Sequence, residues 1–189
     1  MARPAGLRVV AGELGGLRLV APRDTRPTTE RVREAVFSAL GDRFVGESVL
    51  DLFAGSGAMA IEALSRGAAR AVLVDREPAA MAAIRKNLVT TRLLNRARSV
   101  RRPARAFLQA HAPREAPFGL VLCDPPYDLG TRPLRAVLEL LARPGWLSAG
   151  AAIVVERREK IGAPELPGGW VSSWQRSYGD TLVVIASTP

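Results

Sequence analysis

Short apolar runs alternate with helix-period segments along most of the chain. Seven runs are predicted to be strands, and they begin near Ser48, Arg70, Ala97, Phe118, Ala151, Val171 and Asp180. The helices predicted between them run from Ala58 to Arg66, from Pro78 to about Leu88, from roughly Ala104 to Ala110, and from Pro133 to Ala142. Such alternation is typical of an α/β fold, in which helices cover both faces of a mostly parallel sheet.

The connection between the last two predicted strands consists only of Tyr178-Gly179-Asp180. A crossover between parallel strands needs a dozen or more residues, so these two strands must form an antiparallel hairpin. We therefore predict a seven-stranded, mostly parallel sheet whose last strand is antiparallel.

An N-terminal extension, residues 1–43, precedes the α/β domain, which we place at residues 44–189. The pattern of the extension predicts a β-hairpin, from Leu7 to Gly12 and from Leu17 to Val20, and then a loop at residues 23–28. The α/β fold does not require these residues. We expect the hairpin and the loop to hold a substrate over the domain.

A helix is predicted after this loop. Its apolar positions follow i, i+3, i+4, i+7, i+8 spacing, and they are Val32, Ala35, Val36, Ala39 and Leu40. Thr28 or Thr29 can cap the helix. The apolar stripe predicts a face packed on the core.

A glycine-rich turn follows the first strand of the domain, within the segment Val49-Leu-Asp51-Leu-Phe-Ala-Gly55-Ser-Gly57-Ala-Met-Ala60. Gly55 and Gly57 let the backbone approach a ligand closely, and the helix after them directs free N–H groups at it. Asp75 ends the next strand, where its carboxylate can accept from ribose hydroxyls. The turn also satisfies the G-x-G-x-x-G/A dinucleotide fingerprint, so it fits both NAD and S-adenosylmethionine. The position of Asp51, facing a cationic amino group, favours S-adenosylmethionine.

A second motif, Asp124-Pro125-Pro126-Tyr127, ends the buried strand that begins at Phe118. The Asp124 carboxylate and the Pro125 carbonyl can accept hydrogens from an exocyclic amine, and the two prolines restrict the backbone that carries them. Tyr127 offers a face for stacking against a base. These four residues predict a catalytic site for methylation of a base amine, and together with the glycine turn they favour S-adenosylmethionine over NAD.

Composition narrows the class of protein further. A chain of 189 residues with 48% hydrophobic content can bury one good core. No window approaches eighteen uninterrupted apolar residues, so we expect a cytoplasmic protein without a membrane segment. Cys123 and His111 are the only residues of their types, which predicts neither an internal disulfide nor a metal site.

The formal net charge of +9 is concentrated in one segment. Residues 85–105 carry eight basic residues and no acidic ones: Arg85, Lys86, Arg92, Arg96, Arg98, Arg101, Arg102 and Arg105. A phosphate-bearing partner accounts for the cluster, but residues 92–98 lie between the end of a predicted helix and the start of the next strand, opposite the cofactor face. The better candidates for contact are Arg101, Arg102 and Arg105, at the far end of the third predicted strand. Arg8 and Arg18, on the predicted hairpin, are candidates as well.

The chain resembles the bacterial RsmD family of small-subunit rRNA guanine-N2 methyltransferases. The resemblance rests on Arg8-Val-Val-Ala-Gly12, Arg26-Pro-Thr-Thr-Glu-Arg-Val-Arg-Glu34, Leu50-Asp-Leu-Phe-Ala-Gly-Ser-Gly57, Glu62-Ala-Leu-Ser-Arg-Gly67 and Asp124-Pro-Pro-Tyr127. It implies a Rossmann-like class I methyltransferase fold, S-adenosyl-L-methionine as cofactor, and a target of the guanine 966 type in 16S rRNA, within the 30S subunit or an assembly intermediate.

The resemblance also implies roles for individual residues. Asp51, Gly55 and Gly57 would bind the methionine end of the cofactor and Asp75 its ribose. The target base would be held by Asp124, Pro125 and Tyr127. The extension would contact RNA, with Arg26 and Thr28 near the mouth of the active site. Pro103-Ala104 departs from the small polar or acidic residue that the family tends to place before an alanine, so the adenine contact stays unassigned.

Three other functions fit parts of the sequence. An adenine-N6 DNA methyltransferase shares Asp124-Pro-Pro-Tyr127 but normally needs a target-recognition region, for which 189 residues leave little room. An NAD-linked oxidoreductase would use the same glycine turn. A non-catalytic RNA-binding module would keep the turn without transferring a methyl group.

Overall fold

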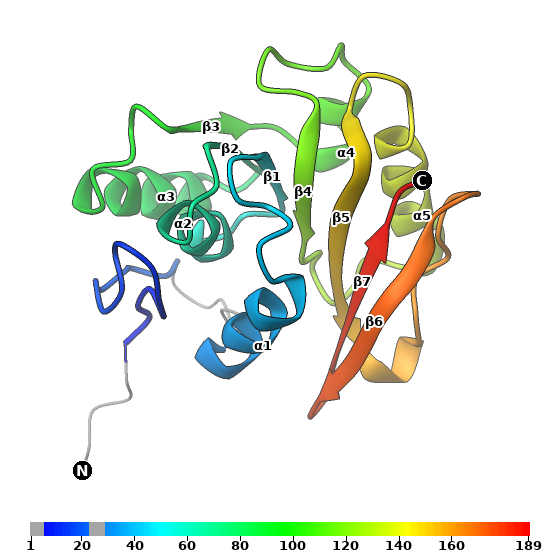
Figure 1. Ribbon diagram of the computed structural model, residues 1–189, viewed down its shortest axis with the longest axis horizontal. Coiled ribbons are helices and arrows are strands. Elements are labelled where there is room, and N and C mark those ends of the chain that lie inside the picture. Colours follow the sequence, from blue (N-terminus) through cyan, green and yellow to red (C-terminus); the bar gives the residue numbers. More distant parts are fainter. Residues whose placement is uncertain (1–5, 23–28) are drawn as a thin grey trace.

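The computed structural model describes residues 6–22 and 29–189 (Figure 1). Within these residues the strands are β1 (Ser48–Leu52), β2 (Arg70–Asp75), β3 (Ala97–Arg101), β4 (Phe118–Cys123), β5 (Leu147–Arg158), β6 (Val171–Tyr178) and β7 (Thr181–Ser187). They form one seven-stranded sheet in the order β3-β2-β1-β4-β5-β7-β6. β7 pairs antiparallel with both β5 and β6, whereas the pairs from β3 to β5 are parallel. The predicted sheet and its reversed last strand are confirmed.

Helices cover both faces of this sheet. They are α1 (Glu30–Leu40), α2 (Ala58–Ser65), α3 (Pro78–Thr90), α4 (Ala104–Leu108) and α5 (Thr131–Leu141), with a 3-10 turn, η1 (Glu159–Ile161), after β5. The apolar faces of α1, α2 and α3 share one core cluster, and α4 and α5 belong to a second cluster. Successive strand residues point to opposite faces, so Leu120 joins the first cluster and Val121 the second. Burial on both faces explains the continuous apolar runs in the sequence.

Element boundaries differ from the predictions in small ways. β5 begins at Leu147, earlier than Ala151, because Phe118 pairs with Leu147 before a register shift. Ser148 and Gly150 lie in this irregular first part of β5. They interrupt the apolar pattern, so the sequence did not indicate the true start of the strand. None of these shifts moves a predicted site residue away from its strand end.

The hairpin predicted in the extension is reduced to one antiparallel bridge between Arg8 and Arg18, and the loop predicted at residues 23–28 lies outside the described residues. Thr29 caps α1, since its Oγ1 accepts from the N–H of Val32 at 3.3 Å; Thr28 lies outside the described residues. Val9 is buried in the same core as α1 and α2. Because a continuous core crosses residue 43, the boundary between the extension and the domain stays a prediction.

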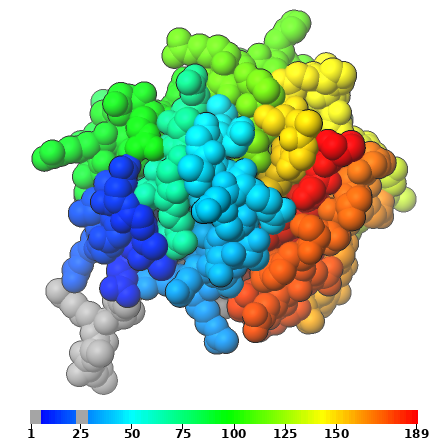
Figure 2. Space-filling model, in the orientation of Figure 1, coloured from blue at the N-terminus to red at the C-terminus, as the bar shows by residue number. Residues whose placement is uncertain are grey.

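Glu62 of α2 fixes the extension to the domain. Its carboxylate is fully buried and accepts from the N–H groups of Val10 at 2.7 Å and Ala11 at 3.0 Å, and from Nε of Arg66 at 2.7 Å. Figure 2 shows residues 6–22, in dark blue, packed against the cyan and green surface of the domain. The extension is therefore attached to the helix that follows the glycine turn.

Candidate active site

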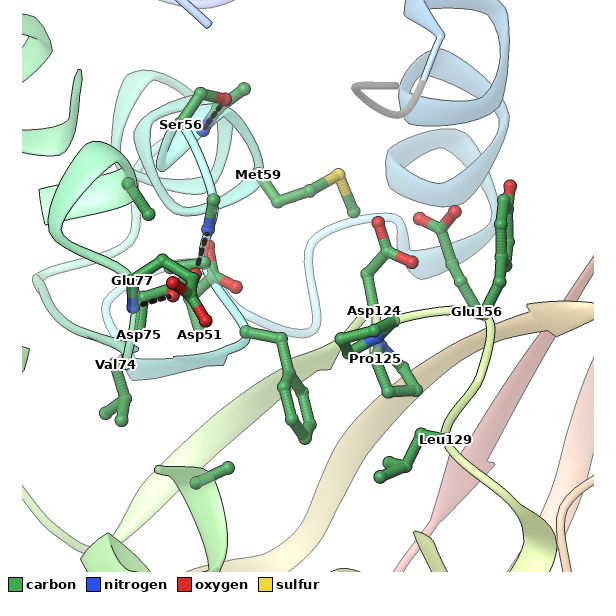
Figure 3. A pocket seen from close by; sticks show the side chains of 18 of the residues that line it. Asp51, Ser56, Met59, Val74, Asp75, Glu77, Asp124, Pro125, Leu129 and Glu156 are labelled. Carbon is green, nitrogen blue, oxygen red and sulfur yellow. Dashed lines mark hydrogen bonds between the residues drawn. The ribbon is translucent and has the colours of Figure 1, made fainter. Parts of the chain in front are cut away.

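The carboxyl ends of β1, β2, β4 and β5 surround a cleft of about 1170 Å³ (Figure 3). The glycine turn after β1 forms one wall, and the segment after β4 forms another. Open parallel sheets bind their ligands at this edge, beyond the carboxyl ends of the strands. The structure thus brings both sequence motifs to one cleft.

The two glycines of the turn are needed for different reasons. Both have positive φ, +55° at Gly55 and +76° at Gly57. A Cβ on Gly57 would lie 2.7 Å from Cδ2 of Leu73, so the turn packs directly on β2. A Cβ on Gly55 would meet no atom closer than the carbonyl oxygen of Phe53 at 4.0 Å. Gly57 therefore permits close packing, whereas Gly55 leaves an open backbone surface in the cleft.

We expect Gly57→Ala to destabilise the fold by about 2–5 kcal/mol. The positive φ accounts for about 1–2 kcal/mol and the contact with Leu73 for about 1–3 kcal/mol. Gly145→Ala is the matched control, because Gly145 also has positive φ (+88°) but open space at Cβ, and it follows Pro144 in a turn in which the N–H of Trp146 donates to the carbonyl of Arg143. Urea unfolding of both variants measures the difference. Equal losses of stability would show that packing at Gly57 contributes nothing.

Asp75 accepts hydrogen bonds from the backbone of the glycine turn and of the segment after β2. Its Oδ2 accepts from the N–H of Gly55 at 2.8 Å and its Oδ1 from the N–H of Glu77 at 2.9 Å (Figure 3). A carboxylate offers about four lone-pair sites, so both oxygens keep acceptor capacity for a ligand. The predicted contact with ribose hydroxyls is compatible with this position and stays a prediction.

Asp51 is a buried acid, with 3% of its surface exposed. Its Oδ2 accepts from the N–H of Ala60 at 3.3 Å, which ties the end of β1 to α2. Burial raises the pKa of Asp51 well above its ordinary value, and the negative charges of Asp124 and Asp75 raise it further. A cation in the cleft would offset these effects, so the local charge favours a positively charged ligand group.

Asp124 lies directly after β4, and Figure 3 shows its carboxylate directed into the cleft beside that of Glu156. Pro125 is buried and also lines the cleft. Tyr127 is held on one side by Arg158, whose Cζ lies 4.8 Å from the ring centroid, and its hydroxyl lies 3.4 Å from Oγ1 of Thr181. Since the guanidinium covers one face of the ring, a base could stack only on the other face.

The predicted RNA contacts divide into three groups. Arg102 and Arg105 are exposed and line the cleft. Arg101 does not line the cleft, and its Nε donates to the carbonyl of Arg76 at 3.4 Å. Arg8 forms an ion pair with Glu30 at 3.1 Å. Arg18 is exposed on the extension, and two further candidates, Arg26 and Thr28, lie outside the described residues. RNA binding by all seven stays a prediction.

Sequence reasoning missed several residues of the cleft. They are Phe53, Glu77, Glu156, Arg176, Tyr178 and Thr181. Glu156 carried a usable signal, because it is a charged residue that follows the apolar run Ala151–Val155 on a strand next to β4. The lining residues of β6 and β7 gave no such signal in the sequence, because the hydrophobic pattern does not predict where these two strands lie in the sheet. Ala104, which follows Pro103, lines the cleft too.

The described residues contain neither a metal-binding cluster nor a membrane-spanning helix. Across residues 6–22 and 29–189, no group of three or more His, Cys, Asp or Glu side chains is arranged to hold a metal ion. No helix in the same ranges is both long and apolar enough to cross a membrane.

Comparison with known proteins gives consistent matches. A protein-family model described as Conserved hypothetical protein 95 matches residues 7–187. Ribosomal RNA small subunit methyltransferase D of Escherichia coli (strain K12) is 40% identical over 166 residues, which cover 87% of this chain and 81% of that protein. The putative rRNA methyltransferase YlbH of Bacillus subtilis (strain 168) is 39% identical over 181 residues, 95% of this chain and 97% of that one. The structure of the putative methyltransferase yhhF from Escherichia coli superposes with a TM-score of 0.87 at 34% identity, over 97% of this chain and 98% of that chain.

Proposed function

Because this chain belongs to the RsmD family, we propose that it transfers a methyl group from S-adenosyl-L-methionine to the exocyclic N2 amine of a guanine in 16S rRNA. The target is of the guanine 966 type, within the 30S subunit or an assembly intermediate in the cytoplasm. The fold is that of the class I methyltransferases, and the relatives named above are rRNA methyltransferases by name. One observation carries the proposal: the glycine turn with buried Asp51 and the Asp124-Pro125-Pro126-Tyr127 segment face each other across one cleft.

The cleft fits the cofactor chemically. S-adenosylmethionine, when bound, supplies an electrophilic methyl group on a sulfonium. The buried carboxylate of Asp51 suits the ammonium of its methionine part, and the open backbone at Gly55 allows close approach. Asp75 lies beside Gly55 with acceptor capacity for ribose hydroxyls. Burial raises the pKa of Asp51, and a cation beside its carboxyl group would lower it again. Binding of the cofactor is therefore linked to release of a proton from Asp51.

Asp124 and Pro125 act on the target amine in this proposal. The lone pair of a guanine amine is delocalised into the ring, so acceptors for its hydrogens localise that pair toward the methyl group. Tyr127 stacks on the base, which must be unpaired or extruded from the RNA. The acceleration then comes mainly from positioning and electrostatics. Asp124 need not be a general base, because the product ammonium is acidic enough to lose its proton afterwards.

Transfer of labelled methyl to different polymers tests the proposal. We expect label in unmodified small ribosomal subunits, and comparison with stripped rRNA measures how far assembly is needed. Label in DNA alone would favour an adenine-N6 DNA methyltransferase. Measurable cofactor binding without label in any polymer would favour the non-catalytic module. A rise in melting temperature with NAD and none with S-adenosylmethionine would favour the oxidoreductase.

Substitution of Arg102 and Arg105 tests whether RNA binds along this side of the cleft. We expect Arg102→Gln and Arg105→Gln each to raise the KM for the RNA substrate and to reduce the slope of log affinity against log salt by about one. Affinity for S-adenosylmethionine should stay unchanged. Arg70→Gln is the matched control, because Arg70 is exposed at the start of β2, at the opposite end of the sheet. If the salt slope is unchanged in both cleft variants, Arg102 and Arg105 do not contact the RNA phosphates.

A further inference from the structure

We propose that Glu156 determines specificity for guanine: its carboxylate accepts a hydrogen bond from the N1–H of the target base, next to the amine held by Asp124. This inference rests on the proposed function, because it names how the same cleft recognises its base. Glu156 is not part of either sequence motif.

The sheet register places the two carboxylates side by side. Cys123 of β4 pairs with Val155 of β5, so the residues that follow them, Asp124 and Glu156, lie at the same level of adjacent strands. Adjacent strands are about 4.8 Å apart. Figure 3 shows both side chains directed into the same space, and both residues line the cleft. Two acceptors therefore face a ligand from one edge of the sheet.

Glu156 is a charged residue that is almost completely buried. It is 4% exposed, although a buried carboxylate is costly unless its charge is used or compensated. Part of its charge acts on the buried guanidinium of Arg33, whose pKa burial lowers and nearby carboxylates raise. Glu62 and Glu30 oppose that lowering more strongly than Glu156 does. A carboxylate has about four lone-pair sites, so a carboxylate that already has partners can also accept a hydrogen bond from a ligand.

The chemistry of the base explains the need for a second acceptor. Guanine presents two neighbouring donors on its Watson–Crick edge, N1–H and the N2 amine, whereas adenine presents an acceptor at N1. A carboxylate at this position hydrogen-bonds guanine and repels adenine. Sites built to hydrogen-bond one group reject analogues that lack it, because the buried polar group is then unpaired. Asp124-Pro-Pro-Tyr127 alone does not make this distinction, since it suits any exocyclic amine.

A base analogue, compared in the wild type and in a variant of Glu156, tests the contact with N1. 2-Aminopurine keeps the 2-amine that would be methylated but has an acceptor at N1. It also lacks the 6-oxygen of guanine, and this difference cancels when the ratios of the wild type and the variant are compared. We would compare kcat/KM on small subunits that carry guanine or 2-aminopurine at the mapped target position, for the wild type and for Glu156→Gln. The glutamine amide can donate to the N1 of 2-aminopurine. Glu139→Gln is the matched control, because Glu139 lies on α5 outside the cleft and is half exposed.

We expect the wild type to favour guanine over 2-aminopurine by at least about 10-fold. Glu156→Gln should lower this ratio about 10-fold or more and leave the dissociation constant for S-adenosylmethionine unchanged. A variant with lower stability or activity but the wild-type ratio would assign Glu156 a structural role and overturn the inference. Absence of guanine methylation by the wild type would instead contradict the proposed function, so the two failures are distinguishable.

Discussion

Asp124→Ala is expected to lower the rate of methyl transfer by about 100- to 1000-fold at saturating cofactor. The substitution removes an acceptor that faces the target amine at the end of β4, and it leaves the glycine turn intact. Single-turnover transfer gives the rate, and calorimetric titration gives the affinity for S-adenosylmethionine, which should be retained. Loss of rate without loss of affinity identifies an interaction that matters mainly in the transition state.

Two further variants sharpen this prediction. Asp124→Asn keeps one acceptor oxygen, so it should be faster than Asp124→Ala if hydrogen bonding to the amine matters more than proton removal. Asp42→Asn is the matched control, because Asp42 is exposed in the turn after α1 and does not line the cleft. Near-normal transfer by Asp124→Ala would contradict the assigned role.

Asp51→Asn is expected to weaken binding of S-adenosylmethionine by about 10- to 100-fold, the value of a hydrogen bond between charged groups. Burial raises the pKa of Asp51 in the free protein, so the affinity of the wild type should fall as the pH is lowered through that raised pKa. The variant cannot titrate at this position and should lose that part of the pH dependence. Binding isotherms from pH 5 to pH 8 measure both effects.

The same substitution should affect stability in the opposite direction. An acid whose pKa is raised by folding contributes stability below its unfolded-state pKa, and this contribution is lost as the pH rises through the raised value. At pH 7 the wild type without ligand therefore carries a destabilising group, and Asp51→Asn should unfold at an equal or higher temperature. A destabilised variant, or one with unchanged affinity, would contradict the view that Asp51 is kept for the cofactor.

Strand ends account for most of what the sequence predicted about the site. Asp51, Asp75 and Asp124 each lie in or directly after a run of buried apolar residues, and carboxyl ends of parallel strands meet at one edge. The pattern therefore located the motifs without knowledge of side-chain contacts. It did not separate the roles of Gly55 and Gly57, since that depends on the distance to Leu73 across the sheet.

Features that depend on strand order were harder to predict. The insertion of β7 between β5 and β6 brings Thr181 to the hydroxyl of Tyr127, and no local pattern encodes that neighbour. Arg158 likewise covers Tyr127 from a strand 31 positions away in the chain. The roles of charged residues were also hard to predict from the sequence. Arg8 has the positive charge expected of an RNA contact, but it forms an ion pair with Glu30.

Identification of the methylated nucleoside would distinguish guanine-N2 methylation from the alternative reactions. Small subunits that lack the modification would be incubated with the wild-type protein and labelled S-adenosylmethionine, and their rRNA would be digested to nucleosides for mass spectrometry. We expect the label to be recovered as N2-methylguanosine in 16S rRNA, and Asp124→Ala to abolish most of it. Recovery of the label as N6-methyladenosine, or in no nucleoside of that rRNA, would contradict guanine-N2 methylation by this protein.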